Sequence, residues 1–189
     1  MRHKYETRGI VLSRSFSGEA NVFVTLLTPS LGLVCARAQG VRKSGAKLAA
    51  ALATFTESEL VCVRGRESWR VAGAMLQENW FTRMRYPASR ARASRVSGLL
   101  LRLVAGEMRE VTLFPIVKGF FGALTELPND AHDAAEVLAV LRILAALGLD
   151  EGEIPGTASE FAVPLLTAIT KERPHYIVRI NRGITASGL

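Results

Sequence analysis

The sequence predicts an α+β protein in which a small five-stranded β-barrel is followed by an all-helical domain. Short apolar and β-branched segments separated by turn residues fill the first part of the chain, and apolar residues recur at helical spacing from about Pro87 onward. A chain of 189 residues can give each of two such domains its own core. We therefore expect a barrel domain over residues 1–82 and a helical domain over residues 83–189.

The first domain contains five short segments with the composition of β-strands. Turn residues at 16–19 and 28–32 separate the first three segments, and Arg64–Ser68 can join the last two as a hairpin. Because no long helix comes between these segments, they predict a small antiparallel barrel. The expected strands cover residues 9–12, 22–27, 33–36, 60–63 and 69–72.

The segment Gln39–Leu52 lies between the third and fourth expected strands. It begins as a basic loop that contains glycine and ends as an alanine-rich turn of helix. A five-stranded barrel with a helical insertion at this point is the arrangement of the OB fold, which binds oligonucleotides and oligosaccharides. The first domain is therefore predicted to be an OB-fold barrel.

Four apolar stripes at helical spacing predict the helices of the second domain. The third helix is the clearest, because Asn129 or Asp130 can cap its start and Gly148 suits the position just after its end. The last helix is expected to begin near Pro174, a residue that fits the first turn of a helix. The stripes lie within residues 96–104 and 113–124, at Val137, Val140, Leu141, Leu144 and Leu147, and at Ile177, Ile180 and Ile184.

The charge of the chain predicts a polyanionic partner. The formal net charge is +7 and the isoelectric point is near 10.0, which favours nucleic acid or anionic lipid. No acidic residue occurs between Arg83 and Arg102, and arginine suits bidentate contact with phosphate. The alternative is a solvated helix face. The predicted DNA-binding residues are Arg37, Arg42, Lys43, Lys47, Arg64, Arg66, Trp69, Arg70, Arg92 and Arg95.

Aromatic residues can add base stacking to this charge, as in other barrels that bind single strands. Trp69, beside Arg64, Arg66 and Arg70, is the best stacking candidate, and its alternative role is core packing. Strand alternation also places Phe23 on the face opposite to its two valine neighbours, so one of these faces must be exposed or covered.

Catalytic and metal-binding functions are not expected. None of the three histidines lies in a recognisable nucleophile motif, and the glycine that follows Lys43–Ser44 would have to precede it in a Walker loop. Cys35 and Cys62 form no CxxC pair and should be small buried hydrophobic residues, with neither zinc nor a disulfide. Glu57 and Glu59 share a strand face and should face solvent. We predict no enzyme activity, no cofactor and no metal.

Nothing in the sequence predicts a membrane or secreted protein. The charged N-terminus has no apolar core behind it, and the apolar runs are far shorter than the ~20 residues that span a bilayer. A soluble cytoplasmic protein without a membrane partner is expected.

Several segments resemble the opening of RecO proteins. Thr7–Leu12, Gly18–Asn21, Val24–Thr28 and Gly32–Leu33 are similar to the family's GIVL segment, GEAD turn, VTLFT strand and GK turn. Further similar segments are Ala38–Ser44 to the basic ARGARR loop, Ala49–Thr56 to LAGALEPFT, and Val137–Leu149 to the FELRLLxLLGY helix. The resemblance is specific over roughly residues 6–80 and weaker in the helical half.

The resemblance implies a recombination mediator for DNA repair, associated with the nucleoid. RecO proteins bind single- and double-stranded DNA, anneal complementary strands, and cooperate with RecR to load RecA onto DNA coated by single-strand-binding protein. The acidic, apolar-ended tail of that protein docks on the helical domain, so we expect an apolar groove rimmed by cations there. Its candidate residues are Leu99, Leu103, Phe120, Phe121 and Leu141, with Arg92, Arg95, Arg102 and Lys118.

The sequence departs from the family pattern at two places. Asn21 stands where the family usually has Asp, and no cysteines follow Leu149, where many relatives carry a four-cysteine zinc element. The chain thus resembles a short variant without the zinc element. Two other functions stay open: an OB-fold RNA-binding or ribosome-associated module, and a basic adaptor that binds only protein.

Overall fold

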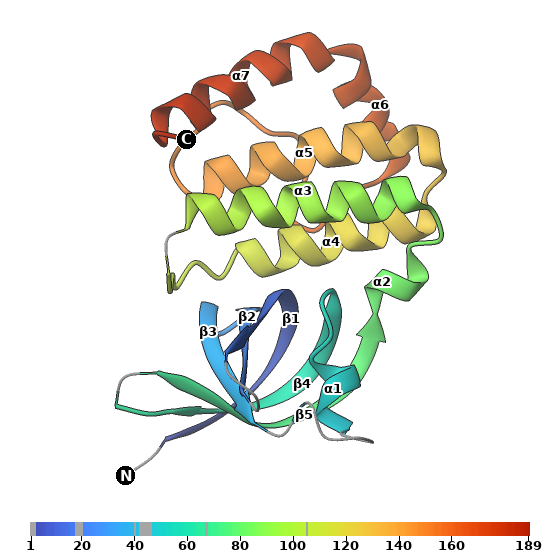
Figure 1. Ribbon diagram of the computed structural model, residues 1–189. Coiled ribbons are helices and arrows are strands. Elements are labelled where there is room, and N and C mark those ends of the chain that lie inside the picture. Colours follow the sequence, from blue (N-terminus) through green and yellow to red (C-terminus); the bar gives the residue numbers. More distant parts are fainter. Residues whose placement is uncertain (1–2, 18–20, 40, 42–46, 67, 105) are drawn as a thin grey trace. The chain divides into compact units, whose positions relative to one another are not determined.

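A computed structural model describes residues 3–17, 21–39, 41, 47–66, 68–104 and 106–189. The chain divides into two compact units, Met1–Arg83 with Gly106–Phe114, and Met84–Ala105 with Pro115–Leu189. The first unit is built around β-strands and the second consists of helices (Figure 1). The α+β class predicted from the sequence is confirmed.

The first unit holds five strands and two short helices. They are β1 (Lys4–Ser17), β2 (Asn21–Thr28), β3 (Gly32–Gln39), α1 (Lys47–Ala51), β4 (Thr56–Arg64), β5 (Trp69–Asn79) and α2 (Trp80–Arg83). The strands close into a barrel in the order β1-β2-β3-β5-β4. With α1 between β3 and β4 in the chain, this is the OB fold that the sequence predicted.

One pairing of the barrel differs from the expected antiparallel pattern. Ala36, Arg37 and Ala38 of β3 pair in parallel with Trp69, Arg70 and Val71 of β5. The other strand pairs are antiparallel. The prediction of a wholly antiparallel barrel was wrong here, because the chain passes through α1 and β4 before β5 returns beside β3 and closes the barrel.

Strand β1 is much longer than the segment 9–12 expected for it. Its first half, Lys4–Ile10, pairs with β4, and its second half, Ile10–Ser17, pairs with β2. A register shift between Val11 and Ser13 accompanies the change of partner. Many of the added residues are polar and exposed, so an apolar pattern in the sequence does not reveal them.

Alternation along the strands separates the barrel core from the outer face of the sheet. The side chains of Phe23, Arg37 and Arg70 stand between residues that face inward and therefore lie on the outer face. The inward residues beside them are Val22, Val24, Ala36, Ala38, Trp69 and Val71, all members of one buried cluster.

The second unit is arranged around α5, which packs against α3, α6 and α7 (Figure 1). Residues 137–144 of α5 are buried without a break, as expected for a helix with neighbours on several sides. Among the described residues, no helix has the length and apolar character needed to cross a membrane. The helices after α2 are α3 (Pro87–Leu103), α4 (Leu113–Glu126), the 3₁₀ turn Asn129–Ala131, α5 (His132–Ala146), α6 (Val163–Lys171) and α7 (Arg173–Ala186).

The two ends of α5 differ in how well the sequence predicted them. Gly148 follows the helix with φ 71°, and the Leu149 N–H donates to the Leu144 carbonyl over 2.8 Å, so the glycine end was predicted correctly. Asn129 and Asp130 do not cap the start. They belong to the 3₁₀ turn instead, and the N-cap residue is Ala131, without a side-chain cap bond.

Helix α6 was not expected, whereas α7 begins at Arg173, close to the predicted Pro174. Only Leu166 and Ile169 of the 9 residues in α6 are buried. So short a segment holds too few turns to show a helical period in the sequence.

Candidate nucleic-acid interface

Three side chains form a row across the outer face of the barrel. Phe23 of β2 pairs with Arg37 of β3, and Arg37 pairs with Arg70 of β5. Phe23 and Arg37 are half-buried, and Arg70 is exposed. Directly opposite residues on neighbouring strands lie about 4.5–5.5 Å apart between Cβ atoms. An aromatic ring and two guanidinium groups are therefore neighbours on one surface.

The arginines of this row also line a polar hollow. The hollow has a volume of ≈ 710 Å³ and is formed by β3, the β4–β5 hairpin and His3. Among the lining residues that the structure describes, none is acidic, so a positive potential is expected there. Five predicted DNA-binding residues line it: the four arginines Arg37, Arg64, Arg66 and Arg70, and Trp69.

Arg64 is the most constrained of these four arginines. Its guanidinium lies 5.0 Å from the centre of the Trp69 ring, which is a cation–π arrangement. Its Nη1 donates to Oε2 of Glu107 over 2.7 Å. The ring and the carboxylate together fix how this guanidinium is oriented in the hollow.

Trp69 is not the exposed stacking platform that we expected. Only 7% of the residue is accessible, its ring meets Tyr5 edge-on at 5.2 Å between centroids, and it belongs to the barrel core. The reason is alternation, since Trp69 and Val71 face inward on either side of Arg70. The aromatic side chain on the outer face is Phe23, which the same alternation could have singled out in the sequence.

The remaining predicted contacts of the first domain cannot be placed. Arg42 and Lys43 lie outside the described residues, as does the side chain of Lys47 at the start of α1.

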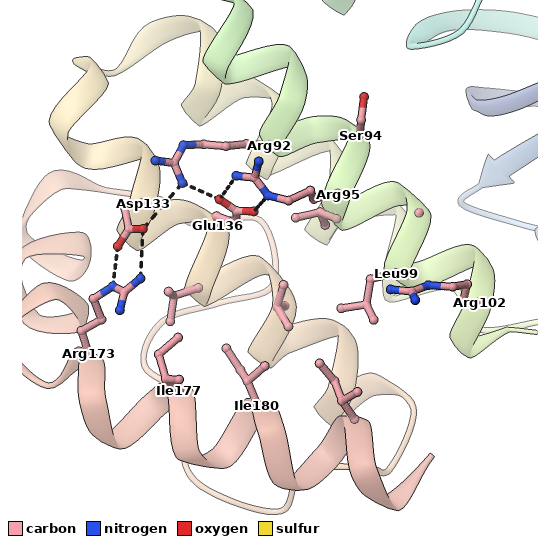
Figure 2. Close-up of a pocket in the computed structure, with 15 residues that line it drawn as sticks. Arg92, Ser94, Arg95, Leu99, Arg102, Asp133, Glu136, Arg173, Ile177 and Ile180 are labelled. Atoms are coloured by element: carbon pink, nitrogen blue, oxygen red, sulfur yellow. Dashed lines mark hydrogen bonds and ion pairs between the residues drawn. The ribbon is translucent and has the colours of Figure 1, made fainter. Parts of the chain in front are cut away.

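Arg92 and Arg95 of α3 have acidic partners, contrary to what the sequence suggested. Both arginines donate to Glu136 of α5, Arg95 through bonds of 2.7 and 2.8 Å (Figure 2). Asp133, one turn earlier in α5, binds Arg173 of α7 over 2.7 Å. The stretch of α3 lacks acidic residues in its own sequence, but α5 supplies them in space. These charges are therefore largely neutralised within the helical unit.

The same helices enclose an apolar groove of ≈ 870 Å³. Ile177 and Ile180 of α7 point into it, and Leu99 of α3 lines it (Figure 2). Arg102 is exposed at its edge and forms no ion pair with any described residue. Of the apolar residues proposed for such a groove, only Leu99 lines it. Phe120, Phe121 and Leu141 are completely buried, because the centres of their stripes form the core.

Two expectations about ionisable side chains were wrong. Cys35 is exposed, because it shares the outer face with Arg37, and its pKa is raised first by partial burial and then by the negative charge of Glu107. Cys62 is buried as expected, and burial raises its pKa to about 11. Glu57 is 2% exposed rather than facing solvent, and its Oε1 lies 3.6 Å from Nε of Arg8.

The described residues contain no cluster of three or more His, Cys, Asp or Glu that could hold a metal.

Comparison with known proteins points to one family. Residues 1–78 match the family described as "Recombination protein O N terminal". The chain is 31% identical over 179 residues to a "DNA repair protein RecO" of Thermobifida fusca, covering 84% of this chain and 69% of the relative. It is 39% identical over 72 residues to the protein of the same name from Dehalococcoides mccartyi strain 195, covering 38% and 28%.

A third relative also matches most of the chain. This "DNA repair protein RecO" of Roseiflexus sp. strain RS-1 is 34% identical over 145 residues, which cover 76% of this chain and 50% of the relative. The chain thus spans between 28% and 69% of the length of these three relatives.

Proposed function

The chain belongs to the RecO family, and from this we propose that it is a DNA-binding mediator of recombinational repair whose OB-fold barrel holds single-stranded DNA. The observation that carries the proposal is the hollow beside the row Phe23–Arg37–Arg70, where four arginines meet and no described lining residue is acidic. This is the surface of an OB fold, the face of strands 2 and 3 with the loop between strands 4 and 5, that binds oligonucleotides.

The chemistry of the row suits a single strand. The guanidinium group of arginine donates two parallel hydrogen bonds to phosphate oxygens, and the release of condensed counterions adds affinity that falls with salt. The exposed part of the Phe23 ring offers a base a stacking surface, and every base has a π-face, so binding should be tolerant of sequence. No base-reading motif is needed for this mode of binding.

Strand annealing follows from such a surface without bond chemistry. A cationic face screens the repulsion between two phosphate backbones and raises their local concentration, while base pairing supplies the free energy. We propose that residues 1–82 provide this activity and residues 83–189 the contacts with other proteins. In this proposal the protein acts with RecR to load RecA, on double- as well as single-stranded substrates, in the cytoplasm and at the nucleoid, and it is not an enzyme.

The groove between α3, α5 and α7 favours a second role, the binding of the acidic, apolar-ended tail of single-strand-binding protein. Leu99, Ile177 and Ile180 can hold the apolar end. Arg102 can take the terminal carboxylate, since Arg92 and Arg95 are already paired with Glu136. The arrangement is an apolar anchor combined with charge-assisted capture of a carboxylate.

The DNA proposal is tested by measuring the affinity of a labelled single-stranded oligonucleotide at several salt concentrations. Arg37→Gln combined with Arg70→Gln should weaken binding and reduce the slope of log affinity against log salt by about two, one for each lost phosphate contact. The control carries Lys171→Gln and Arg182→Gln, two exposed positions on α6 and α7. It has the same net charge and should bind like the wild type. Equal weakening in both double variants would reduce the effect to net charge and contradict the proposal.

The same assay with RNA separates the alternative function. A marked preference for RNA that depends on the 2′-hydroxyl would favour an RNA-binding module.

The role of the groove is tested with an acidic peptide that has an apolar, free C-terminal end. It should bind the wild type several-fold more tightly than Arg102→Gln, whereas Arg182→Gln should bind the peptide as the wild type does. Unchanged binding by Arg102→Gln would exclude Arg102 as the carboxylate site.

A further inference from the structure

Residues Gly106–Thr112, the strap, link α3 to α4 but belong to the barrel unit. Met108 and Leu33 exchange two backbone hydrogen bonds, of 2.8 and 3.1 Å. Gly32, with φ 70°, lies so close to the strap that a Cβ atom at this position would come within 2.1 Å of the Met108 carbonyl oxygen. Only glycine permits this close approach. The strap is therefore seated in a fixed register at the start of β3.

This register places a carboxylate at the edge of the cationic hollow. Glu107, next to Met108, binds Nη1 of Arg64 over 2.7 Å, and both side chains are 41% exposed. The central carbon of the Arg64 guanidinium, Cζ, lies over the ring of Trp69, which belongs to the barrel core. The carboxylate thus occupies an edge of a guanidinium that the Trp69 ring already holds in place.

We propose that Glu107 is an intramolecular competitor for nucleic-acid phosphate at Arg64. A carboxylate and a phosphodiester accept the same guanidinium N–H groups, so a strand must displace Glu107 before it uses this edge of Arg64. The inference rests on the proposed function of the hollow and names a residue that lowers the affinity of the hollow for nucleic acid. Because an exposed ion pair contributes little, the strap weakens binding without blocking it.

The competition has a signature in salt dependence as well as in affinity. When a strand displaces Glu107, the freed carboxylate stands near the phosphates and repels them. When the charge of Glu107 is removed, the guanidinium of Arg64 holds no carboxylate before the strand binds. The variant Glu107→Gln should therefore bind more tightly and show a steeper salt slope, by up to about one unit.

The test uses the full chain and a labelled single-stranded oligonucleotide, with Glu107→Gln, Arg64→Gln, their double variant and Glu110→Gln. Glu107→Gln should tighten binding about fivefold at low salt, the upper end of what an exposed ion pair contributes. In the Arg64→Gln background the same substitution should tighten binding no more than Glu110→Gln does in the wild type. Glu110→Gln is the matched control, because it removes one charge from the same strap. Within the described part of the chain, the Glu110 carboxylate accepts hydrogen bonds from the Thr112 N–H and hydroxyl and pairs with no arginine.

Three outcomes overturn the inference: no gain in affinity with Glu107→Gln, an equal gain with Glu110→Gln, or a gain of the same size when Arg64 is absent. In each of these cases the proposed function stands if the wild type binds single strands and Arg64→Gln weakens that binding. If the wild type binds no nucleic acid, the proposed function fails and the inference fails with it. Thermal unfolding of each variant confirms that the comparison is made between folded proteins.

Discussion

At the scale of single residues, Phe23 adds to the barrel face something that charge cannot. It is half-buried between two inward valines and lies beside Arg37 on the outer face. A base that stacks on its ring gains affinity that salt does not screen, whereas phosphate contacts weaken as salt rises. The row should therefore combine a salt-sensitive and a salt-insensitive contribution to binding.

The first prediction concerns Phe23→Ala. It should weaken binding of single-stranded DNA about tenfold, since stacking on an aromatic side chain contributes about 1–3 kcal/mol per base. The salt slope should stay as in the wild type, because no phosphate contact is lost. Phe23→Tyr keeps the ring and should retain the affinity. A changed salt slope with unchanged affinity at high salt would show that Phe23 stacks on no base.

His132 is a buried histidine whose surroundings favour the neutral ring. It is 1% exposed, its Nε2 lies 3.0 Å from the Leu127 carbonyl oxygen, and its Nδ1 lies 3.2 Å from Oγ of Ser89. The carbonyl can only accept, so Nε2 carries the proton and Nδ1 accepts from the serine hydroxyl. Burial, the largest cause, lowers the pKa of His132, and the charge of Arg92 lowers it further, against opposing effects of Leu127 and Asp130.

The second prediction is that stability falls in mild acid through His132. Its pKa is lower in the folded protein than the ordinary value of 6.5. The unfolded chain therefore binds a proton first as pH falls below that value, and the free energy of unfolding decreases, by at most about 1.4 kcal/mol per pH unit for one proton. Above pH 6.5 the contribution is fully present. Urea unfolding at several pH values measures it.

His132→Gln keeps a polar side chain and cannot titrate, so it should reduce the fall in the free energy of unfolding in the pH interval just below 6.5, whatever its effect on stability at neutral pH. An unchanged slope in that interval would assign the acid sensitivity to other groups.

Single residues show where the sequence could and could not predict the site. Arg37, Arg64, Arg66 and Arg70 were singled out by charge alone, and the structure brings them together in one hollow. The choice of Trp69 failed because composition says nothing about which strand face a residue occupies. Strand alternation does, and it separates Trp69 from its neighbour Arg70.

At the scale of elements, the end of α5 depends on a backbone conformation that glycine adopts without strain. Gly148 has φ 71°, and a Cβ atom there would meet nothing within 4 Å, so only the dihedral angle opposes a side chain. Gly122, in the interior of α4, is equally free of neighbours but has no positive φ. The two glycines therefore isolate conformation from packing.

The third prediction uses this pair. Gly148→Ala should destabilise the protein by about 1 kcal/mol, because a left-handed conformation is costly for any residue with a Cβ atom. Gly122→Ala should stabilise it by about 0.5–1 kcal/mol, because alanine loses less entropy in a helix. Chemical unfolding followed by helical circular dichroism measures both. The same sign for both substitutions would contradict the role given to the Gly148 conformation.

The elements also show which local signals are strong. The apolar stripes of α5 and α7, and the glycine and proline at their ends, were sufficient to predict these helices. Helix α6 was missed because it is short, and the full length of β1 because it changes partner from β4 to β2 within one strand. A change of partner is a property of the barrel and leaves no local pattern.

At the scale of the whole molecule, the net charge is +7, but the basic residues of the two units differ in whether they are paired with acidic residues. In the helical unit, Arg92, Arg95 and Arg173 are paired with Asp133 and Glu136. In the barrel unit, four arginines line the hollow, and none of the lining residues in the described part of the chain is acidic. The absence of acidic residues near an arginine run in the sequence does not reveal whether these arginines are paired in the fold. The acidic residues of α5 that pair with Arg92 and Arg95 lie some forty positions away in the chain.

The most direct test of the central claim is a nuclear magnetic resonance titration of the labelled full chain with a short thymidine oligonucleotide. We predict that the resonances of Phe23, Arg37 and Arg70 change most, together with those of the β4–β5 hairpin, while Arg92 and Arg95 keep theirs. The claim is contradicted if the largest changes fall on α3 and α5 and the outer face of β2, β3 and β5 is unaffected.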